Sequence, residues 1–244
     1  MPLNAIDFQE VTKNYGDVSV LKNITLQIAD KETTALVGES GSGKTTLLQL
    51  VNGLTEPTGG FVEIFGEKID YDYLPDLRKK MGYAVQGGGL FPHMTVYENI
   101  TVMAKLVGWS DDAIKERANY VVELVDFHKV YLERFPHNLS GGQQQRVSLC
   151  RAMMLDPPLL LLDEPFSALD PITKGYIHKE FLKLQKAESR AILLVTHDMD
   201  EAVKLADNIV IIGGGEVVQT GKTTDIVAEP KNDYVEELLK AVTS

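Results

Sequence analysis

The residues best suited to chemistry lie in one short segment near the N-terminus. Residues 38–45 read Gly-Glu-Ser-Gly-Ser-Gly-Lys-Thr, which fits the phosphate-binding pattern G-x-x-x-x-G-K-[ST]. Glycines let the backbone turn tightly and aim several N–H groups into one concavity, which suits an anion. We expect Lys44 to place its charge near the β- and γ-phosphates of a nucleotide, and Thr45 to offer its hydroxyl to Mg²⁺. The candidate phosphate-binding residues are Gly38, Glu39, Ser40, Gly41, Ser42, Gly43, Lys44, Thr45 and Thr46.

The sequence on both sides of this loop supports the same interpretation. Residues 33–37 predict a buried strand, and residues 46–51 predict the start of a helix. Strand, glycine-rich turn and helix is the context of such a loop, because the helix dipole adds positive potential at its N-terminus. The alternative is a glycine-rich turn that precedes Lys-Thr by chance.

Two further motifs lie beside predicted elements. Residues 139–146 read Leu-Ser-Gly-Gly-Gln-Gln-Gln-Arg and open a predicted helix, where a serine and two glycines make a second anion-binding terminus. Asp163 and Glu164 follow a strand of four leucines, and open α/β sheets bind ligands at the carboxyl ends of their strands. We therefore expect Asp163 to hold Mg²⁺ through water, and Glu164 to reach an attacking water molecule.

The composition bounds the class of protein. The chain has 244 residues, 44% hydrophobic and 24% charged, as expected for one ordinary globular domain. Its net charge of −11 argues against a nucleic-acid partner, which usually needs a basic face. The single cysteine, Cys150, excludes an intramolecular disulfide and a cysteine metal cage, so the chain suits a reducing compartment. We interpret Cys150 as a small core residue.

No segment of the chain has the pattern of a signal peptide or a membrane span. The N-terminus lacks a basic stretch followed by an apolar one, and no run of 18 apolar residues occurs. We expect any work at a membrane to go through a partner.

The apolar pattern predicts an α/β fold with a mostly parallel sheet. Near-continuous apolar runs at residues 159–162, 191–195 and 208–212 suit strands that are buried on both faces. Amphipathic stretches near residues 176–185 and 199–205 predict helices between these strands.

The remaining segments are more irregular. Residues 1–30 alternate apolar and polar side chains and predict short strands with a turn at residues 14–17. Strands are also expected at residues 59–66 and 81–86. From Pro92 to about Pro157 the pattern is helical, with Ser110 as one N-cap.

These motifs together resemble the ATP-binding-cassette (ABC) ATPase family over nearly the whole chain. The phosphate loop, the Leu-Ser-Gly-Gly-Gln segment at 139–143 and the Asp163–Glu164 pair occur in the family's order. Four further positions match functional positions of the family. In order along the chain, they correspond to the aromatic residue that stacks on adenine, the glutamine near Mg²⁺ and the attacking water, the loop at the dimer interface, and the switch histidine. They are Tyr15, Gln86, residues 167–170 and His197.

The resemblance implies a P-loop NTPase core with a mostly parallel sheet, an N-terminal antiparallel β subdomain and a helical insert subdomain. It implies one ABC ATPase domain over residues 1–244. Residues 1–89 and 157–244 would form the core with the β subdomain, and residues 90–156 the helical subdomain that contains the Leu-Ser-Gly-Gly-Gln segment.

The resemblance also assigns roles, with ATP and Mg²⁺ as the cofactors. Glu164 would be the general base and His197 the contact to the γ-phosphate, together with Gln86 and Lys44 as catalytic residues. Besides the loop, the ATP-binding residues would be Tyr15, Ser140, Gly141, Gly142, Gln143 and Asp170. The metal site would use Thr45, Gln86 and Asp163.

A homodimer follows from the same resemblance. Two chains would pair head to tail and trap two ATP molecules, each between the loop of one chain and Ser140, Gly141 and Gly142 of the other. One chain carries a single loop and a single Leu-Ser-Gly-Gly-Gln segment, so it cannot complete a site alone. The pairing would be isologous.

Simpler interpretations of several of these residues stand beside the functional ones. Tyr15 could be a turn aromatic, Gln86 a polar residue at a strand end, and Asp170 a cap for the segment that follows it. His197 is one of five histidines, and we take the other four as surface or structural residues. These four are His93, His128, His137 and His178.

Residues 81–86 and 89–100 look like the bacterial importer ATPases, and are closest to those for osmoprotectants and quaternary amines such as glycine betaine, choline and carnitine. Related importers of amino acids share parts of these stretches, so an amino-acid-like solute stays open. Residues 166–173 and 196–202 point the same way. The partners implied are integral membrane permease subunits and a solute-binding protein or domain, without nucleic acid. The protein would be cytoplasmic and peripheral on the inner face of the cell membrane.

Two departures from this group stand out. Residues 87–89 are all glycine where bulkier residues are usual, so we expect a pliant loop beside the surface that meets the permease. Several members carry an added C-terminal regulatory domain, whereas this chain ends at Ser244 soon after an apparent terminal helix. Regulation through such a domain is therefore not expected.

Two other classes of function stay open. The same ATPase could drive a lipid or drug exporter, which would lack a solute-binding protein. A non-transport cassette protein in DNA repair or translation is the third class. The single cassette, the acidic charge and the lack of a coiled-coil insert or basic arm argue against it.

Overall fold

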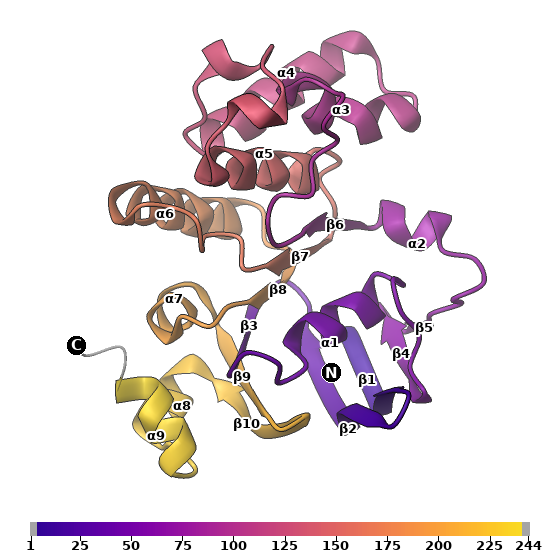
Figure 1. The fold of residues 1–244 in the computed structure, drawn as a ribbon, viewed down its shortest axis with the longest axis vertical. Coiled ribbons are helices and arrows are strands. Elements are labelled where there is room, and N and C mark those ends of the chain that lie inside the picture. The colour runs from indigo at the N-terminus through magenta and orange to yellow at the C-terminus, as the bar shows by residue number, and fades with distance from the viewer. Residues whose placement is uncertain (1–3, 241–244) are drawn as a thin grey trace. The chain divides into compact units, whose positions relative to one another are not determined.

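The structure, a computed structural model, describes residues 4–240. The chain forms two compact units (Figure 1). The first unit is built from the residues up to Arg78 and from Arg190 onward, and the second from Lys79–Ser189. A short helix, α2 (Pro75–Lys79), lies where the chain passes from the first unit to the second.

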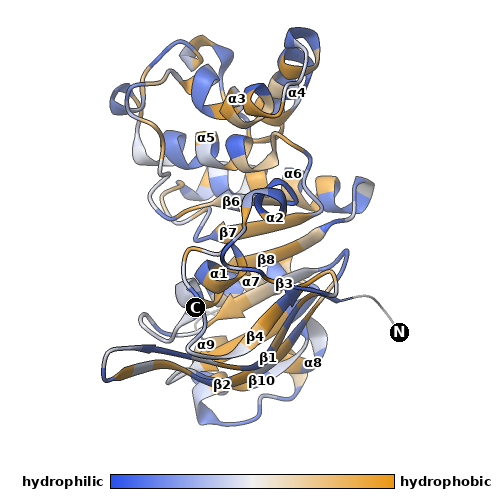
Figure 2. Cartoon of the chain, turned by 90° about the vertical axis from the view of Figure 1, so that its right-hand side faces the viewer, coloured by the Kyte–Doolittle hydropathy of each residue, from blue (hydrophilic) through white to orange (hydrophobic). Residues whose placement is uncertain are grey.

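The first unit contains an antiparallel sheet with the strand order β2-β1-β4-β5. Its strands are β1 (Asn4–Tyr15), β2 (Val18–Ala29), β4 (Gly59–Ile64) and β5 (Glu67–Lys68). Residues 1–30 were expected to form short strands, and this was wrong, because β1 and β2 each run for twelve residues. The register between them shifts at several points, for example between Phe8 and Val11, so the apolar alternation slips although the strand continues. The mixture of hydrophobic and hydrophilic residues along both strands is visible in Figure 2.

The parallel strands of the first unit carry the phosphate loop. Strand β3 (Thr33–Val37) pairs in parallel with β8 (Ala191–Val195) on one side and β9 (Asn208–Gly213) on the other. All five residues of β3 and of β8 are buried. Burial on both faces explains the unbroken apolar sequence of β8, whereas β3 begins with two buried threonines, Thr33 and Thr34. The polar strand β10 (Glu216–Lys222) was not predicted. It pairs antiparallel with β9 and lies at the edge of the sheet, so its composition gives little signal.

Besides α2, four helices lie in the described residues of the first unit. They are α1 (Lys44–Val51), α7 (Met199–Leu205), α8 (Thr223–Ala228) and α9 (Asp233–Lys240). Val235 of α9 lies in the same buried cluster as Ala35 and Val37 of β3, so the last described helix closes the core behind the strand that leads into the phosphate loop.

The second unit holds two parallel strands, β6 (Met81–Ala84) and β7 (Leu159–Asp163). Its helices are α3 (Val96–Leu106), α4 (Asp111–Leu124), α5 (Gly141–Met153) and α6 (Pro171–Ala187), with short 3₁₀ turns η1 (Lys129–Tyr131) and η2 (Pro136–Asn138). Helices α3 and α4 both pack against α5 (Figure 1). Strand β6 ends two residues before the predicted end of the strand at 81–86.

Local hydrogen bonds fix where these helices begin. Ser110 caps α4 as expected, since its side chain accepts a hydrogen bond from the amide of Ala113. Thr95 and Glu98 form a capping box at the start of α3, in which each side chain accepts from the other's backbone amide. Cys150 on α5 is fully buried and its Sγ lies 3.3 Å from the Val121 carbonyl oxygen, so it is the core residue the sequence predicted. Burial raises the pKa of its thiol.

Across residues 4–240, no helix combines the length and the apolar character that a membrane crossing requires. The division into a core of residues 1–89 and 157–244 and a helical subdomain of residues 90–156 stays a prediction.

The turn that follows β3 needs a glycine at position 38. A Cβ atom there would lie 2.1 Å from the backbone carbonyl oxygen of Ile212, which cannot move without disturbing β9. Gly41, in the same loop, has open space around it and a φ of 80°. Gly38→Ala should therefore lower the free energy of unfolding by about 3 kcal/mol through steric overlap. Gly41→Ala should cost about 1 kcal/mol, through the left-handed backbone alone.

The measurement is urea unfolding of both variants and the wild type without nucleotide. Equal stabilities of the two variants would contradict the close approach of Gly38 to Ile212.

Candidate functional site

The phosphate loop is held together by the lysine that the sequence singled out. Lys44 is buried, and its Nζ donates hydrogen bonds to the carbonyl oxygens of Gly38, at 2.8 Å, and Glu39, at 2.7 Å. A buried ammonium needs such partners, because leaving water without them is costly. The amide of Ser42 also donates to the Glu39 carbonyl at 3.2 Å. The chain thus turns around the ammonium of Lys44.

The start of helix α1 suits an anion. Its N-cap, Gly43, has a left-handed backbone with a φ of 105°, and no side chain caps the helix. Glycine is favoured here by the left-handed backbone. A Cβ atom would also lie 2.6 Å from Leu21 Cδ2 on β2, so this leucine side chain would have to shift. The first turn contains no acidic residue. The amides at this end can therefore bind phosphate oxygens, and the helix dipole favours negative charge there.

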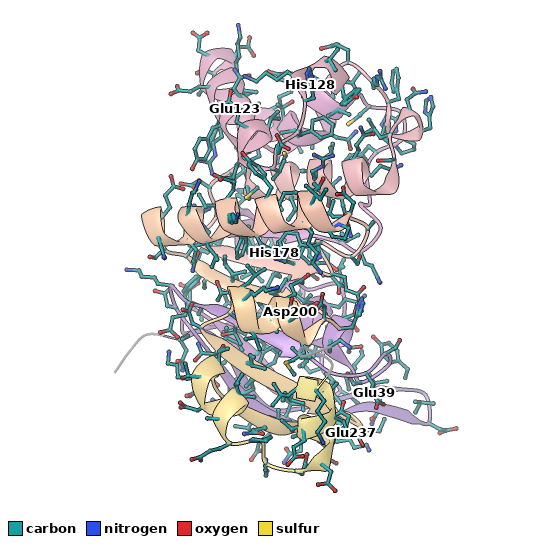
Figure 3. The ribbon with its side chains drawn as sticks, turned by 90° about the vertical axis from the view of Figure 1, so that its left-hand side faces the viewer. Glu39, Glu123, His128, His178, Asp200 and Glu237 are labelled. Carbon is teal, nitrogen blue, oxygen red and sulfur yellow. The ribbon has the colours of Figure 1, made fainter. Side chains whose placement is uncertain are left out.

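An open pocket of about 530 Å³ lies beside the loop. The loop, the end of β9 with the turn after it, β10 and the start of α9 with the residue before it all contribute to its lining. The lining residues are Glu39, Ser40, Gly41, Ser42, Gly213, Gly214, Val218, Asn232 and Tyr234. The hydroxyl of Tyr234 accepts from the Glu39 amide at 3.4 Å and lies 3.5 Å from the Ile212 carbonyl oxygen. Figure 3 labels Glu39 in the loop and Glu237 on α9. The sequence placed Tyr234 only in a terminal helix, because this contact joins residues 195 positions apart.

His197 leaves the sheet at the same edge as the phosphate loop. Strands β3 and β8 are parallel with Leu36 opposite Val195, and the Thr196 amide donates to the Leu36 carbonyl at 3.1 Å. The His197 side chain is exposed. The next residue, Asp198, caps α7 by accepting from the amide of Glu201 at 3.2 Å. Histidine and loop are therefore both anchored at the carboxyl ends of neighbouring strands.

Tyr15 lies at the turn between β1 and β2. Its side chain is 48% exposed, and Lys13 Nζ lies 4.8 Å from the centre of its ring. A few residues further along β2, the Val20 carbonyl oxygen lies within 3.2 Å of the position a Cβ atom would take on Gly43. The turn offers an aromatic surface that suits stacking on a flat ligand. The adenine contact itself stays a prediction.

In the second unit, the structure brings Gln86 and Glu164 together. Strands β6 and β7 are parallel with Ala84 opposite Leu162, so both side chains follow carboxyl ends at one edge. Gln86 Nε2 donates a hydrogen bond to Glu164 Oε2 at 3.0 Å. Asp163, the last residue of β7, is buried directly before this pair. Glu164 has a φ of 48°, a left-handed conformation that is strained for a residue with a side chain.

The Leu-Ser-Gly-Gly-Gln segment forms the N-terminus of α5. Ser140 Oγ accepts from the Gln143 amide at 3.3 Å, and Gln143 Oε1 accepts from the Ser140 amide at 2.9 Å. This capping box fixes the entry to the helix at Gly141. Gly142 touches the loop after β7, because a Cβ atom on it would lie 2.8 Å from the Ala168 carbonyl oxygen.

Asp170 does what the simpler interpretation expected. Its side chain caps α6 by accepting from the Thr173 amide at 3.0 Å. Hydrogen bonds from Thr173 hold the pKa of Asp170 below its usual value. A contact to ATP across a dimer interface stays a prediction for this residue.

Two of the histidines set aside by the sequence analysis have structural roles. His178 on α6, labelled in Figure 3, is buried. Its ring meets that of Phe166 edge-on, with ring centres 4.9 Å apart. His128 Nδ1 accepts from the Val130 amide at 3.2 Å and caps η1.

Gln145 was not predicted as a functional residue. This residue is buried on α5, and its amide spans the loop after β7: Nε2 donates to the Glu164 carbonyl at 2.8 Å and to Ser167 Oγ at 2.9 Å. Its Oε1 accepts from the Ala168 amide at 2.9 Å. One signal was available, since Gln145 stands four residues before Leu149 on the helix face that is buried, where a polar side chain needs partners.

Comparison with known proteins places the chain. The model of the family described as "ABC transporter" matches residues 21–167. The choline transport ATP-binding protein OpuBA of Bacillus subtilis (strain 168) is 47% identical over 235 residues, which are 96% of this chain and 62% of that protein. The glycine betaine uptake system ATP-binding protein YehX of Escherichia coli (strain K12) is 41% identical over 95% of this chain and 75% of its own length.

Solved structures agree with the sequence comparison. A bacterial ABC transporter cassette solved as a dimer superposes with a TM-score of 0.84 at 33% identity, covering 89% of this chain and 98% of its own. The same cassette in a post-hydrolysis state, bound to ADP and Pi, also gives 0.84, at 32% identity and the same coverage. The predicted fold class is thereby confirmed: an α/β ABC ATPase core with a mostly parallel sheet, an antiparallel β subdomain and a helical subdomain.

The chain spans about three-fifths of the length of the Bacillus relative. With a family model that matches more than half of its residues, the chain belongs to the ABC transporter family.

Proposed function

We propose that this chain is the ATP-binding and ATP-hydrolysing subunit of an ABC transporter that powers solute import through a separate membrane permease. The observation that carries the proposal is the phosphate loop, in which buried Lys44 lies beside an uncapped helix N-terminus. The similar proteins named above are ATP-binding subunits of choline and glycine betaine transport systems, which supports both ATP binding and import.

The residues present fit ATP and Mg²⁺. The cradle of glycine amides and the Lys44 ammonium match the negative phosphates. The proposed metal ligands, Thr45, Gln86 and Asp163, offer hydroxyl, amide and carboxylate oxygens, which are the donors that Mg²⁺ prefers. When bound, the ion would neutralise charge on the phosphate oxygens.

The second unit supplies groups for hydrolysis. Glu164 takes the proton of the attacking water as general base, and the hydrogen bond from Gln86 orients its carboxylate. Lys44 stabilises charge on the transferred phosphoryl group. His197 contacts the γ-phosphate and responds to its presence. These roles follow from residue chemistry and the family pattern.

A homodimer completes the proposed site. Each ATP would lie between the loop of one chain and Ser140, Gly141 and Gly142 of its partner, because one chain carries only one of each element. The dimeric cassette among the solved structures supports this assembly. Pairing is isologous, so one contact surface serves both chains.

The proposed cargo is an osmoprotectant, another quaternary amine or a related amino-acid-like solute. Choline and glycine betaine appear in the names of the similar proteins. The chain would then sit in the cytoplasm against the inner face of the membrane, bound to permease subunits, with a solute-binding protein as the selective component. Export of a lipid or drug by the same ATPase is the alternative, which no feature of this chain favours.

Replacing the general base separates ATP binding from hydrolysis. Glu164→Gln keeps the size of the side chain but cannot accept the proton, so turnover should fall by about two to four orders of magnitude. ATP should still bind, and an ATP-bound dimer should accumulate. Phosphate release and sedimentation of the purified variant with Mg²⁺-ATP measure both effects.

Lys44→Ala serves as the matched comparison, because it removes the charge that faces the phosphates. Its affinity for ATP should fall about tenfold or more, the worth of a hydrogen bond to a charged group. Near-normal turnover in Glu164→Gln would contradict the role of Glu164 as general base. Unchanged ATP affinity in Lys44→Ala would contradict the role of the loop in binding the phosphates.

The transport proposal predicts which proteins accompany the chain. Affinity purification of the tagged chain from solubilised native membranes, followed by mass spectrometry, should recover a multi-spanning permease together with a solute-binding protein or domain. The tag alone, treated in the same way, is the control. A permease without a solute-binding protein would favour export, and a soluble or nucleic-acid-associated partner would overturn transport altogether.

A further inference from the structure

Helix α5 contacts both loops that carry the Gln86–Glu164 pair. In the first turns of this helix, the side-chain amide of Gln145 makes three hydrogen bonds to the loop after β7. Its partners there are Glu164, Ser167 and Ala168. The helix lies beside β6 (Figure 1). The two pack tightly, since a Cβ atom on Gly82 would lie 2.0 Å from the Ala152 carbonyl oxygen. The helix is therefore a fixed support against which a loop can be held.

The backbone of Glu164 needs such support. Its φ of 48° costs free energy, and a conformation of this kind persists only where the surroundings determine it. Its carbonyl oxygen accepts from Gln145 Nε2 at 2.8 Å, from Ser167 Oγ at 3.0 Å and from the Ser167 amide at 3.4 Å. These donors fix the peptide group, and with it the direction in which the carboxylate leaves the backbone.

The other end of the pair is held from the last turns of the same helix. Arg151 donates from Nη1 to the Gly89 carbonyl oxygen at 2.9 Å and from Nη2 to that of Gly88 at 3.3 Å. Its guanidinium carbon lies 5.7 Å from the centre of the Phe91 ring. Residues 87–89 were predicted to form a pliant loop. Arg151 holds this loop through the carbonyl groups of its second and third glycines, Gly88 and Gly89.

We propose that Gln145 and Arg151 are positioning residues that hold Glu164 and Gln86 at hydrogen-bond distance from each other for ATP hydrolysis. The inference rests on the proposed function, because it assumes that this pair acts on water. Neither residue touches the nucleotide in this account. Each acts through a backbone segment, and a rigid helix sets the distance between the two segments.

The test uses substitutions that keep volume and remove hydrogen bonds. Gln145→Met and Arg151→Met replace the polar groups but leave the apolar stem of each side chain. Ser148→Ala is the matched control, since Ser148 is buried on α5 like Gln145 and its hydroxyl has no hydrogen-bond partner within residues 4–240. For each full-length variant, kcat and KM for Mg²⁺-ATP and hydrogen–deuterium exchange without nucleotide are measured.

Positioning predicts a split between the kinetic constants. Gln145→Met and Arg151→Met should each lower kcat about tenfold while KM changes by less than about twofold, because the lost alignment matters only in the chemical step. Exchange should rise in residues 164–169 for the first variant and in residues 86–91 for the second. Ser148→Ala should match the wild type in all three measurements.

Contrary results are equally specific. A kcat within about twofold of wild type in both methionine variants, or unchanged exchange in both loops, would overturn the inference. A fall in kcat that Ser148→Ala shares would mean a general loss of helix packing, and would also overturn it. A wild-type chain that hydrolyses no ATP would refute the proposed function instead, while exchange would still decide whether Gln145 and Arg151 hold their loops.

Discussion

The structure depends first on a positive charge that is buried at a tight turn. Lys44 is buried, and its ammonium donates hydrogen bonds to the carbonyl oxygens of Gly38 and Glu39. The backbone of the loop therefore curves around the ammonium. The strand before the turn is wholly buried and the helix after it starts on a left-handed glycine, so neither flank can shift easily. A nucleotide phosphate is the natural counter-charge for this arrangement, which is why the proposed function begins here.

In both units, the chemistry follows the carboxyl ends of parallel strands. His197 follows β8 beside the strand that leads into the phosphate loop, and Gln86 and Glu164 follow the paired strands β6 and β7. Such edges bring together side chains that lie far apart in sequence, because parallel neighbours end on the same side. The strands alone set the distance between the Gln86 and Glu164 side chains only approximately. In our proposal, the hydrogen bonds from Gln145 and Arg151 on α5 fix this distance more closely.

The sequence predicts best those features that are encoded in consecutive residues. The phosphate loop, the buried strands and the cap at Ser110 are written in consecutive residues, and the structure contains all of them. The lengths of β1 and β2 were underestimated because register shifts interrupt their alternation, and β10 was missed because an edge strand can be polar. Gln145 and Tyr234 gain their meaning from partners distant in sequence, which no local pattern shows.

The most direct test of the central claim is a calorimetric titration of the purified chain with ATP, ADP and AMP in the presence of Mg²⁺. If the loop around Lys44 binds the β- and γ-phosphates, ATP should bind at about one nucleotide per chain, and AMP should bind at least about a hundredfold more weakly, because it lacks the groups that meet the ammonium and the helix amides. Equal affinities for AMP and ATP would place recognition in the nucleoside alone and contradict the account.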